Sequence, residues 1–201
     1  MQINTAISDL VLAIVSFWVG IKFLNAKRLS LKGSGWGLLS ISAGAFLGVI
    51  YFLDYKSIEP IYRPIVQFAG IVGVPWIGIG FFDLALKRIV DKSWLVITLI
   101  LCAGFLLDFF IGLGLYATII GAISFIVIIV SCIYFYKSQT YNAIQGIFGS
   151  FLFIIAGLVV GTNGSMYGIL KVDIFHYIIS LACYFLGTSL IHLSKQFQYR
   201  N

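Results

Sequence analysis

Two of the few ionisable side chains inside the apolar segments of this sequence stand out as candidates for chemistry. Asp9 belongs to the first apolar segment and His176 to the last, with Asp173 three residues before His176. Residues spaced by three share one face of a helix, so the Asp173 carboxylate could orient or pair with the imidazole. An ionisable group in hydrocarbon costs free energy unless it is paired or hydrated, which makes these residues the first functional candidates.

Further polar residues are expected at the same depth. Asp108 ends the fourth apolar segment, Tyr51 lies near the end of the second, and Asn163 follows the sixth. With the residues above, they could line an outward-opening cavity for a cation, a proton relay or a polar head group. Alternatively, the acids contact water at helix ends, and Asp173 favours the dipole of the helix that it begins. We assign no catalytic residue, and predict no metal and no cofactor.

The third apolar segment gathers small residues around a proline, with Gly73, Pro75 and Gly78 close together. A proline in mid-span kinks a helix and frees a carbonyl group. Small residues let neighbouring helices approach closely. The pattern predicts either a hinge or cavity wall, or close packing around a static kink.

Several chemistries lack their motifs in this sequence. There is no GxSxG nucleophile elbow, no glycine-rich phosphate loop and no Walker lysine. The three cysteines lie singly in apolar runs, which favours small buried hydrophobes. No lysine lies between Asp173 and His192, where a retinal Schiff base would need one.

Composition identifies the environment that must position these residues. Of 201 residues, 61% are hydrophobic and 10% are charged. A soluble domain of this size cannot bury so much apolar surface, which excludes a cytosolic enzyme, a disulfide scaffold and a disordered chain. A spanning helix needs about 20 apolar residues, and the segments that qualify are 5–24, 35–53, 63–86, 93–111, 114–136, 142–161 and 173–193. We therefore predict an all-α polytopic membrane protein, with residues 1–201 forming a single seven-helix transmembrane domain.

Basic residues predict the orientation of this bundle. Ten of the thirteen lysine and arginine residues lie in the odd-numbered connections and the C-terminal tail, and only Lys56, Arg63 and Lys171 lie on the other side. Cytoplasmic loops carry the excess of positive charge. The N-terminus is therefore expected outside and the C-terminus in the cytoplasm. The charge excess sits in these loops, so we predict no nucleic-acid partner.

A shift of 113 residues places the first three segments on the last three. Ile61-Tyr62-Arg63 then meets Ile174-Phe175-His176, and Ala69 meets Ala182. The pattern predicts a 3+1+3 parallel repeat with the fourth helix as connector. The alternative is that seven successive helices give parallel halves automatically.

The sequence resembles the ceramidase and progestin/adipoQ-receptor superfamily of membrane hydrolases. The resemblance rests on the seven predicted helices, on Ser8-Asp9 in the first helix and on Asp173-Ile174-Phe175-His176 at the start of the last. Uncharacterised bacterial seven-helix proteins of about this length show the same resemblance. The resemblance implies zinc held by one histidine of the second helix and an HxxxH pair in the seventh. Here the second helix has no histidine, and Ser180 stands four residues after His176. The zinc histidines of that superfamily are thus missing.

Three functions remain open. The first is a small-ligand or lipid-binding or accessory protein without chemistry, which the lack of a nucleophile and of a metal triad favours. The second is a small solute or ion transporter or channel, and the third is a membrane-embedded lipid hydrolase related to ceramidases. The expected partners are the lipid bilayer and a small-molecule or lipid ligand. Compact loops and the lack of a targeting sequence indicate a bacterial inner membrane.

Overall fold

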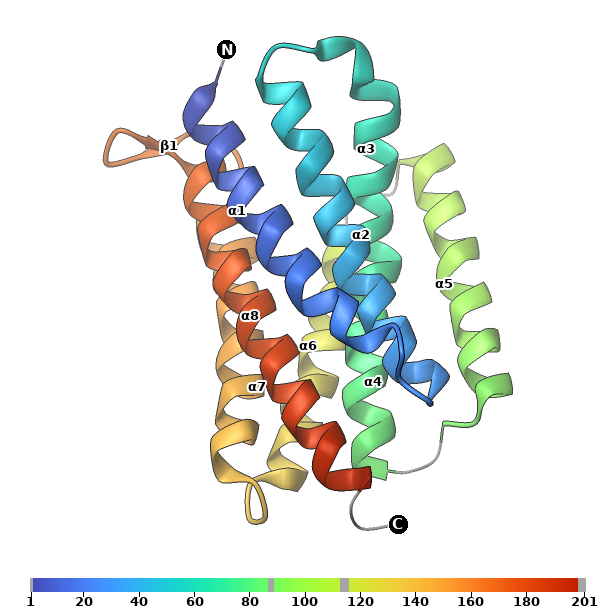
Figure 1. The fold of residues 1–201 in the computed structure, drawn as a ribbon. Helices are drawn as coiled ribbons and strands as arrows, with labels where there is room; N and C mark the ends of the chain where they lie inside the picture. The colour runs from blue at the N-terminus through green and yellow to red at the C-terminus, as the bar shows by residue number, and fades with distance from the viewer. Residues whose placement is uncertain (1, 87–88, 113–115, 199–201) are drawn as a thin grey trace.

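A computed structural model describes residues 2–86, 89–112 and 116–198. In these residues, seven helices are long and apolar enough to cross a membrane (Figure 1). They span Ile3–Phe23, Leu29–Phe52, Lys56–Leu86, Asp91–Ile111, Tyr116–Phe135, Thr140–Val160 and Lys171–Lys195. The predicted all-α fold is confirmed, and the chain is an integral membrane protein.

The elements within these spans are α1 (Ile3–Gly20), η1 (Ile21–Phe23), α2 (Leu29–Phe52), η2 (Lys56–Ile58), α3 (Glu59–Phe68), η3 (Ala69–Gly73), α4 (Val74–Leu86), α5 (Asp91–Ile111), α6 (Tyr116–Phe135), α7 (Thr140–Ile154), η4 (Ile155–Val160) and α8 (Lys171–Gln198). A short antiparallel hairpin, β1 (Ser165–Met166) and β2 (Ile169–Leu170), precedes α8. The two termini lie at opposite ends of the bundle (Figure 1). We call these the N-terminal end and the C-terminal end.

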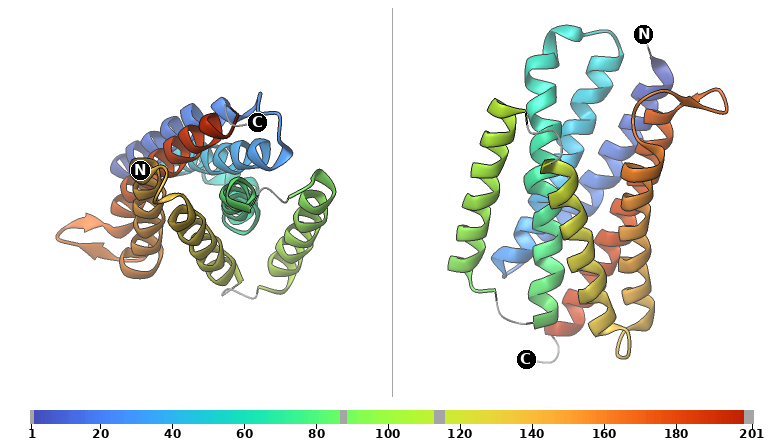
Figure 2. Two further views of the ribbon diagram at one scale, coloured as in Figure 1. Left: turned by 90° about the horizontal axis from the view of Figure 1, so that it is seen from below. Right: turned by 180° about the vertical axis from the view of Figure 1, so that it is seen from behind.

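Six of the spans form a ring in chain order. Helix α1 packs on α2, α2 on α3 and α4, α4 on α6, α6 on α7, α7 on α8, and α8 closes the ring on α1. The fourth span, α5, stands outside and contacts α2, α3 and η3 (Figure 2). A 3+1+3 repeat predicts this arrangement, with the fourth helix as connector, and any six-helix ring in chain order has the same neighbours.

The second and third spans begin earlier than predicted. Helix α2 starts at Leu29, directly after the extended Arg28, and takes Lys32 into its first turns. The third span starts at Lys56, and Pro60 lies at the beginning of α3. Proline suits a first turn because the N–H it lacks would have no partner there. The segments predicted from apolar residues alone could not include these polar first turns.

The third span changes its winding before Pro75. Residues Ala69–Gly73 form a π-helical turn, and α4 resumes at Val74. A π-helical turn widens the backbone ladder at a point where proline cannot donate a hydrogen bond. Gly73 lies against α2 so closely that a Cβ atom on Gly37 would collide with the Gly73 carbonyl oxygen, and a Cβ atom on Gly73 would collide with Ser40 Oγ.

Three features used in the sequence argument lie outside the described residues. They are the turn expected after Gly112, and the basic residues at 87–88 and at 200. Gly112 itself ends α5 in the left-handed conformation, with φ of 69°, and its N–H donates to the Asp108 carbonyl. This is a common helix stop for glycine.

Candidate functional site

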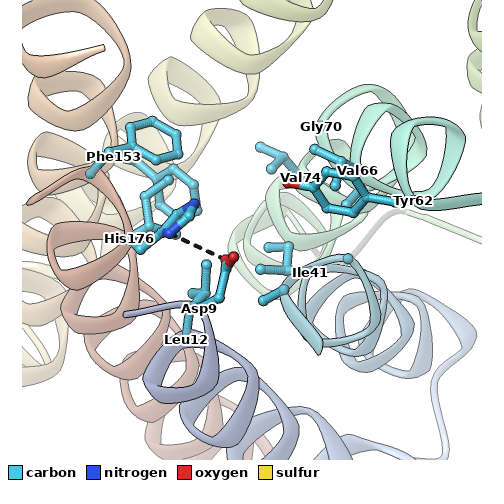
Figure 3. A pocket seen from close by; sticks show the side chains of 14 residues that line it. Asp9, Leu12, Ile41, Tyr62, Val66, Gly70, Val74, Phe153 and His176 are labelled. Atoms are coloured by element: carbon cyan, nitrogen blue, oxygen red, sulfur yellow. Dashed lines mark ion pairs between the residues drawn. The ribbon is translucent and has the colours of Figure 1, made fainter. Parts of the chain in front are cut away.

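Helices α1 and α8 bring Asp9 and His176 together in the half of the bundle that carries the N-terminus. Asp9 lies in the second turn of α1, and His176 in the second turn of α8. The two helices pack along each other. Both side chains are buried, and His176 Nδ1 lies 3.2 Å from Asp9 Oδ1 (Figure 3).

Ser8 fixes which ring nitrogen of His176 carries the hydrogen. Ser8 Oγ donates to the Thr5 carbonyl oxygen at 2.9 Å and lies 3.2 Å from His176 Nδ1. The Ser8 hydroxyl hydrogen is therefore already used, so its oxygen accepts from the ring. When the Asp9 carboxyl group is ionised, its Oδ1 is also an acceptor, and Nδ1 is then the protonated nitrogen that shares its hydrogen between the two oxygens. The remaining nitrogen, Nε2, has no hydrogen bond to a described residue.

The cluster holds more carboxylate oxygens than donors. Asp9 Oδ2 and Asp173 Oδ1 are buried without a hydrogen-bond partner among the described residues. Asp173 lies close enough to Asp9 and to His176 for electrostatic interaction. A buried polar group without a partner is costly. These atoms therefore offer free acceptor capacity to a hydrogen-bond donor or a cation.

A cavity of about 230 Å³ adjoins the pair. Asp9, Tyr62 and His176 supply its polar groups, and no lysine or arginine is among its lining residues (Figure 3). The rest of its wall is apolar: Leu12, Ile41, Gly44, Ala45, Val66, Ala69, Gly70, Val74, Phe153, Phe175 and Ile179. A mainly apolar hollow with a few convergent polar groups is the usual form of a small-molecule site.

Gly48 of α2 makes room for the Asp9 carboxylate. A Cβ atom at position 48 would overlap Asp9 Oδ2 and would lie only 2.8 Å from Asp9 Cγ. Tyr62 faces the same cavity and stacks on Tyr51, with ring centroids 5.1 Å apart. Gly48 and Tyr62 were not among the residues singled out from the sequence.

The other candidates lie away from this cavity. Asp108, on the outlying α5, accepts a hydrogen bond from Gln67 Nε2 at 2.5 Å, and its Oδ1 has no partner among the described residues. Tyr51 contacts Tyr62 but is not part of the wall, and Asn163 is exposed in the turn before β1. The structure thus joins Asp9, Asp173 and His176, and it separates Asp108 and Asn163 from them.

The proposed hinge residues lie at close helix contacts. Gly73 meets α2, as described above, and a Cβ atom at Gly78 would lie 3.2 Å from the Ser124 carbonyl oxygen of α6. Pro75 is buried directly after the π-helical turn. These contacts favour close packing as the role of the glycines, and hinge motion stays a prediction.

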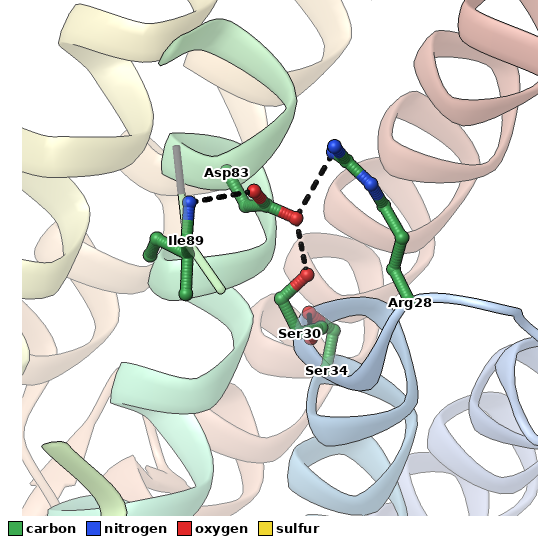
Figure 4. Close-up of polar contacts among 5 residues, drawn as sticks. All are labelled: Arg28, Ser30, Ser34, Asp83 and Ile89. Carbon is green, nitrogen blue, oxygen red and sulfur yellow. Dashed lines mark hydrogen bonds and ion pairs between the residues drawn. The ribbon is translucent and has the colours of Figure 1, made fainter. Parts of the chain in front are cut away.

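A second buried acid, Asp83, lies toward the C-terminal end of the bundle and differs from Asp9 in its hydrogen bonding. Asp83 Oδ2 accepts from Arg28 at 3.1 Å and from Ser30 at 2.5 Å, and Oδ1 accepts from the Ile89 N–H at 3.1 Å (Figure 4). Both oxygens are therefore paired. This cluster ties the first and third connections of the same end to α4, and its chemistry is structural.

The arrangement at His176 is not that of a serine hydrolase. In a catalytic triad the serine and the carboxylate bind different ring nitrogens, whereas Ser8 and Asp9 both lie on Nδ1. Among the described residues, no group of three or more histidine, cysteine, aspartate or glutamate side chains is placed to hold a metal ion. What the site can do with its own groups is accept hydrogen bonds and attract positive charge.

Fold and site together define a seven-helix integral membrane protein with a buried Asp–His pair on an internal cavity. A model of a family of unknown function, DUF6962, matches residues 4–195, and the chain belongs to this family. No curated protein and no solved structure matches the chain. The resemblance to the ceramidase superfamily stays a prediction.

Proposed function

We propose that this protein binds a small amphiphilic molecule whose cationic or hydrogen-bond-donating head lies against Asp9 and His176. The observation that carries the proposal is that a buried carboxylate with spare acceptor capacity borders a cavity with a mainly apolar wall. Asp9 is 2% exposed, has one oxygen with no hydrogen-bond partner in the described part of the chain, and lines a cavity whose wall contains no basic residue. An amine or ammonium group in the cavity would bind the Asp9 carboxylate by a charge-assisted hydrogen bond once the carboxylate turns an oxygen from Gly48 toward the cavity.

His176 supports the same choice of head group. With Nδ1 donating to Asp9 and Ser8, the neutral ring presents an acceptor at Nε2. A carboxylate or phosphate head would instead meet the negative charge of Asp9 and Asp173. We therefore favour amines first, alcohols second, and exclude acids as ligands.

We propose a bacterial inner membrane as the location, with the cavity toward the outer side. The excess of basic residues at the other end of the bundle supports this orientation. A ligand would then reach Asp9 from outside the cytoplasm or from the outer leaflet.

Three probes with equal chains test the head group: n-hexylamine, 1-hexanol and hexanoate. Binding is measured by saturation-transfer NMR with the protein in nanodiscs, against empty nanodiscs. We expect hexylamine to bind best and hexanoate not to bind above the empty discs. Asp9→Asn should weaken hexylamine binding about tenfold, since a hydrogen bond to a charged group contributes about 1.5–3 kcal/mol.

The matched control is Asp54→Asn. Asp54 lies in the exposed turn after α2 with φ of 89°, a conformation that asparagine also adopts well. Its replacement removes the same charge near the same end of the bundle without touching the cavity. Equal loss in both variants, or hexanoate binding as well as hexylamine, would show that the Asp9 cavity does not select the ligand.

A further inference from the structure

A second cavity of about 180 Å³ lies beside the first. The two share five wall residues, which are Gly70, Val74, Phe153, Phe175 and Ile179. The second cavity extends between α6 and the end of the sixth span, where Leu158 is exposed at the surface of the bundle. It therefore adjoins the Asp9 cavity on one side and lies near the outer surface of the bundle on the other.

The two cavities are related by the internal repeat. Adding 113 to seven wall residues of the first cavity gives seven wall residues of the second. The pairs are Asp9 and Ala122, Leu12 and Phe125, Ile41 and Ile154, Gly44 and Gly157, Ala45 and Leu158, Tyr62 and Phe175, and Val66 and Ile179. The same shift aligns Leu39–Gly48 with Leu152–Gly161, two stretches that both read LxIxAGxxxG. Matching walls and a shared motif indicate two copies of one three-helix unit, each contributing a cavity.

The copies differ in polarity at the positions that matter. Asp9 is replaced by Ala122 and Tyr62 by Phe175, while Gly121 stands in the place of Ser8. Thr118 is the one residue with a side-chain polar group in the wall of the second cavity. A cavity with an apolar lining stays dry and takes hydrocarbon.

We propose that the second cavity holds the hydrocarbon chain of the molecule whose head binds Asp9 and His176. This inference rests on the proposed function and adds the shape of its ligand, a single chain with a polar group at one end. The shared wall allows one molecule to occupy both cavities. The hydrocarbon chain of the ligand would lie against the apolar lining of the second cavity, and its head group would bind the carboxylate of the first.

A chain-length series tests this inference. Butylamine, hexylamine, octylamine and decylamine are titrated into the protein in nanodiscs, with the free aqueous amine measured. If the chain enters the second cavity, affinity should rise by up to roughly fourfold per methylene group, the factor for removing one from water. The rise should then stop once the cavity is full.

Gly121→Leu separates the two cavities. A Cβ atom at Gly121 meets no other atom within 4 Å, so the leucine side chain has open space to fill. We expect butylamine to bind this variant as it binds the wild type, and octylamine to lose about tenfold or more. Ala122→Leu should act in the same way, which guards against a folding defect particular to one variant. Ala103→Leu, on the exposed surface of α5, adds a similar side chain remote from both cavities and is the control.

The outcomes are distinct for the two proposals. If butylamine binds neither the wild type nor the variants, the proposed head-group site is wrong. If butylamine binds but the wild type shows no gain with chain length, a bilayer lipid or nothing fills the second cavity, and this inference is overturned. Parallel chain-length series in the wild type and both leucine variants would overturn it as well.

Discussion

Two buried carboxylates, Asp9 and Asp83, occupy opposite ends of the same bundle and are treated in opposite ways. Asp83 has both oxygens paired by Arg28, Ser30 and the backbone of Ile89. Asp9 has one oxygen on His176 and one that no described residue pairs with, and it lines a cavity. A buried carboxylate with its full set of donors holds structure together, whereas one with spare acceptor capacity beside a hollow is available to a ligand.

The largest expected effect is on stability, at Asp83. Asp83→Ala removes the carboxylate that accepts from Ser30 and the Ile89 N–H and that pairs with Arg28, and we expect the free energy of unfolding to fall by about 3 kcal/mol. Thermal unfolding of the purified protein in detergent measures this as a lower Tm. Asp91→Ala, at the exposed start of α5, is the control and should change little. An unchanged Tm for Asp83→Ala would remove the structural role given to this cluster.

Asp9→Asn should show the reverse pattern. The variant removes a buried charge that lacks a full set of partners, so stability should stay level or rise. Hexylamine binding should fall about tenfold, as described above. Asp83→Asn, measured in the same two assays, should give the opposite result. Asp9→Asn should lose hexylamine binding and keep its Tm, whereas Asp83→Asn should have a lower Tm and keep binding. Loss of Tm in Asp9→Asn would assign Asp9 a structural role like that of Asp83.

Gly48→Ala should have an intermediate effect on binding. The added methyl group would displace the Asp9 carboxylate from its position against α2, so butylamine affinity should fall roughly threefold to tenfold, less than or equal to the loss in Asp9→Asn. Ala103→Leu, on the exposed surface of α5 and outside the walls of both cavities, is the control. Titration of both variants with butylamine measures the two affinities. Equal affinities would mean that the carboxylate's position does not matter.

The smallest effect is expected at Ser8. Ser8→Ala removes one of the two acceptors of His176 Nδ1 and leaves Asp9 in place. We expect the affinity for hexylamine to fall by a factor of about two to five, since one neutral hydrogen bond contributes about 1 kcal/mol or less. Ser16→Ala, which changes a buried serine further along α1, serves as the control. A loss at Ser8 as large as that at Asp9 would give the hydroxyl a direct role in binding.

The seven spans could be predicted because a membrane sets a minimum apolar length. The starts of the second and third spans could not, since Arg28, Lys56 and Glu59 border or begin helical turns that the apolar count excludes. The described partners of Asp83 are Arg28 and Ser30 at the beginning of α2 and the Ile89 N–H, and spacing in the sequence does not predict that the first two meet Asp83.

The candidate site was predictable in part. Rarity of ionisable groups in the spans pointed to Asp9 and His176, and helical spacing added Asp173. The expected depth in the membrane also selected Asp108 and Asn163, which the structure places away from the cavity. Depth does not show where a helix lies in the ring or which of its faces turns inward. The repeated LxIxAGxxxG stretch at 39–48 and 152–161 is the sequence signal that points to Gly48 and to the second cavity.

The most direct test of the central claim observes His176 itself. The chain has two histidines, so ¹⁵N-histidine labelling gives a spectrum of two imidazoles, and His192→Gln assigns them. We predict that His176 carries its hydrogen on Nδ1, and that saturation with hexylamine shifts its Nε2 resonance while His192 stays unchanged. A His176 Nε2 resonance that does not move when the amine is bound would contradict the claim that the Asp9–His176 cavity is the ligand site.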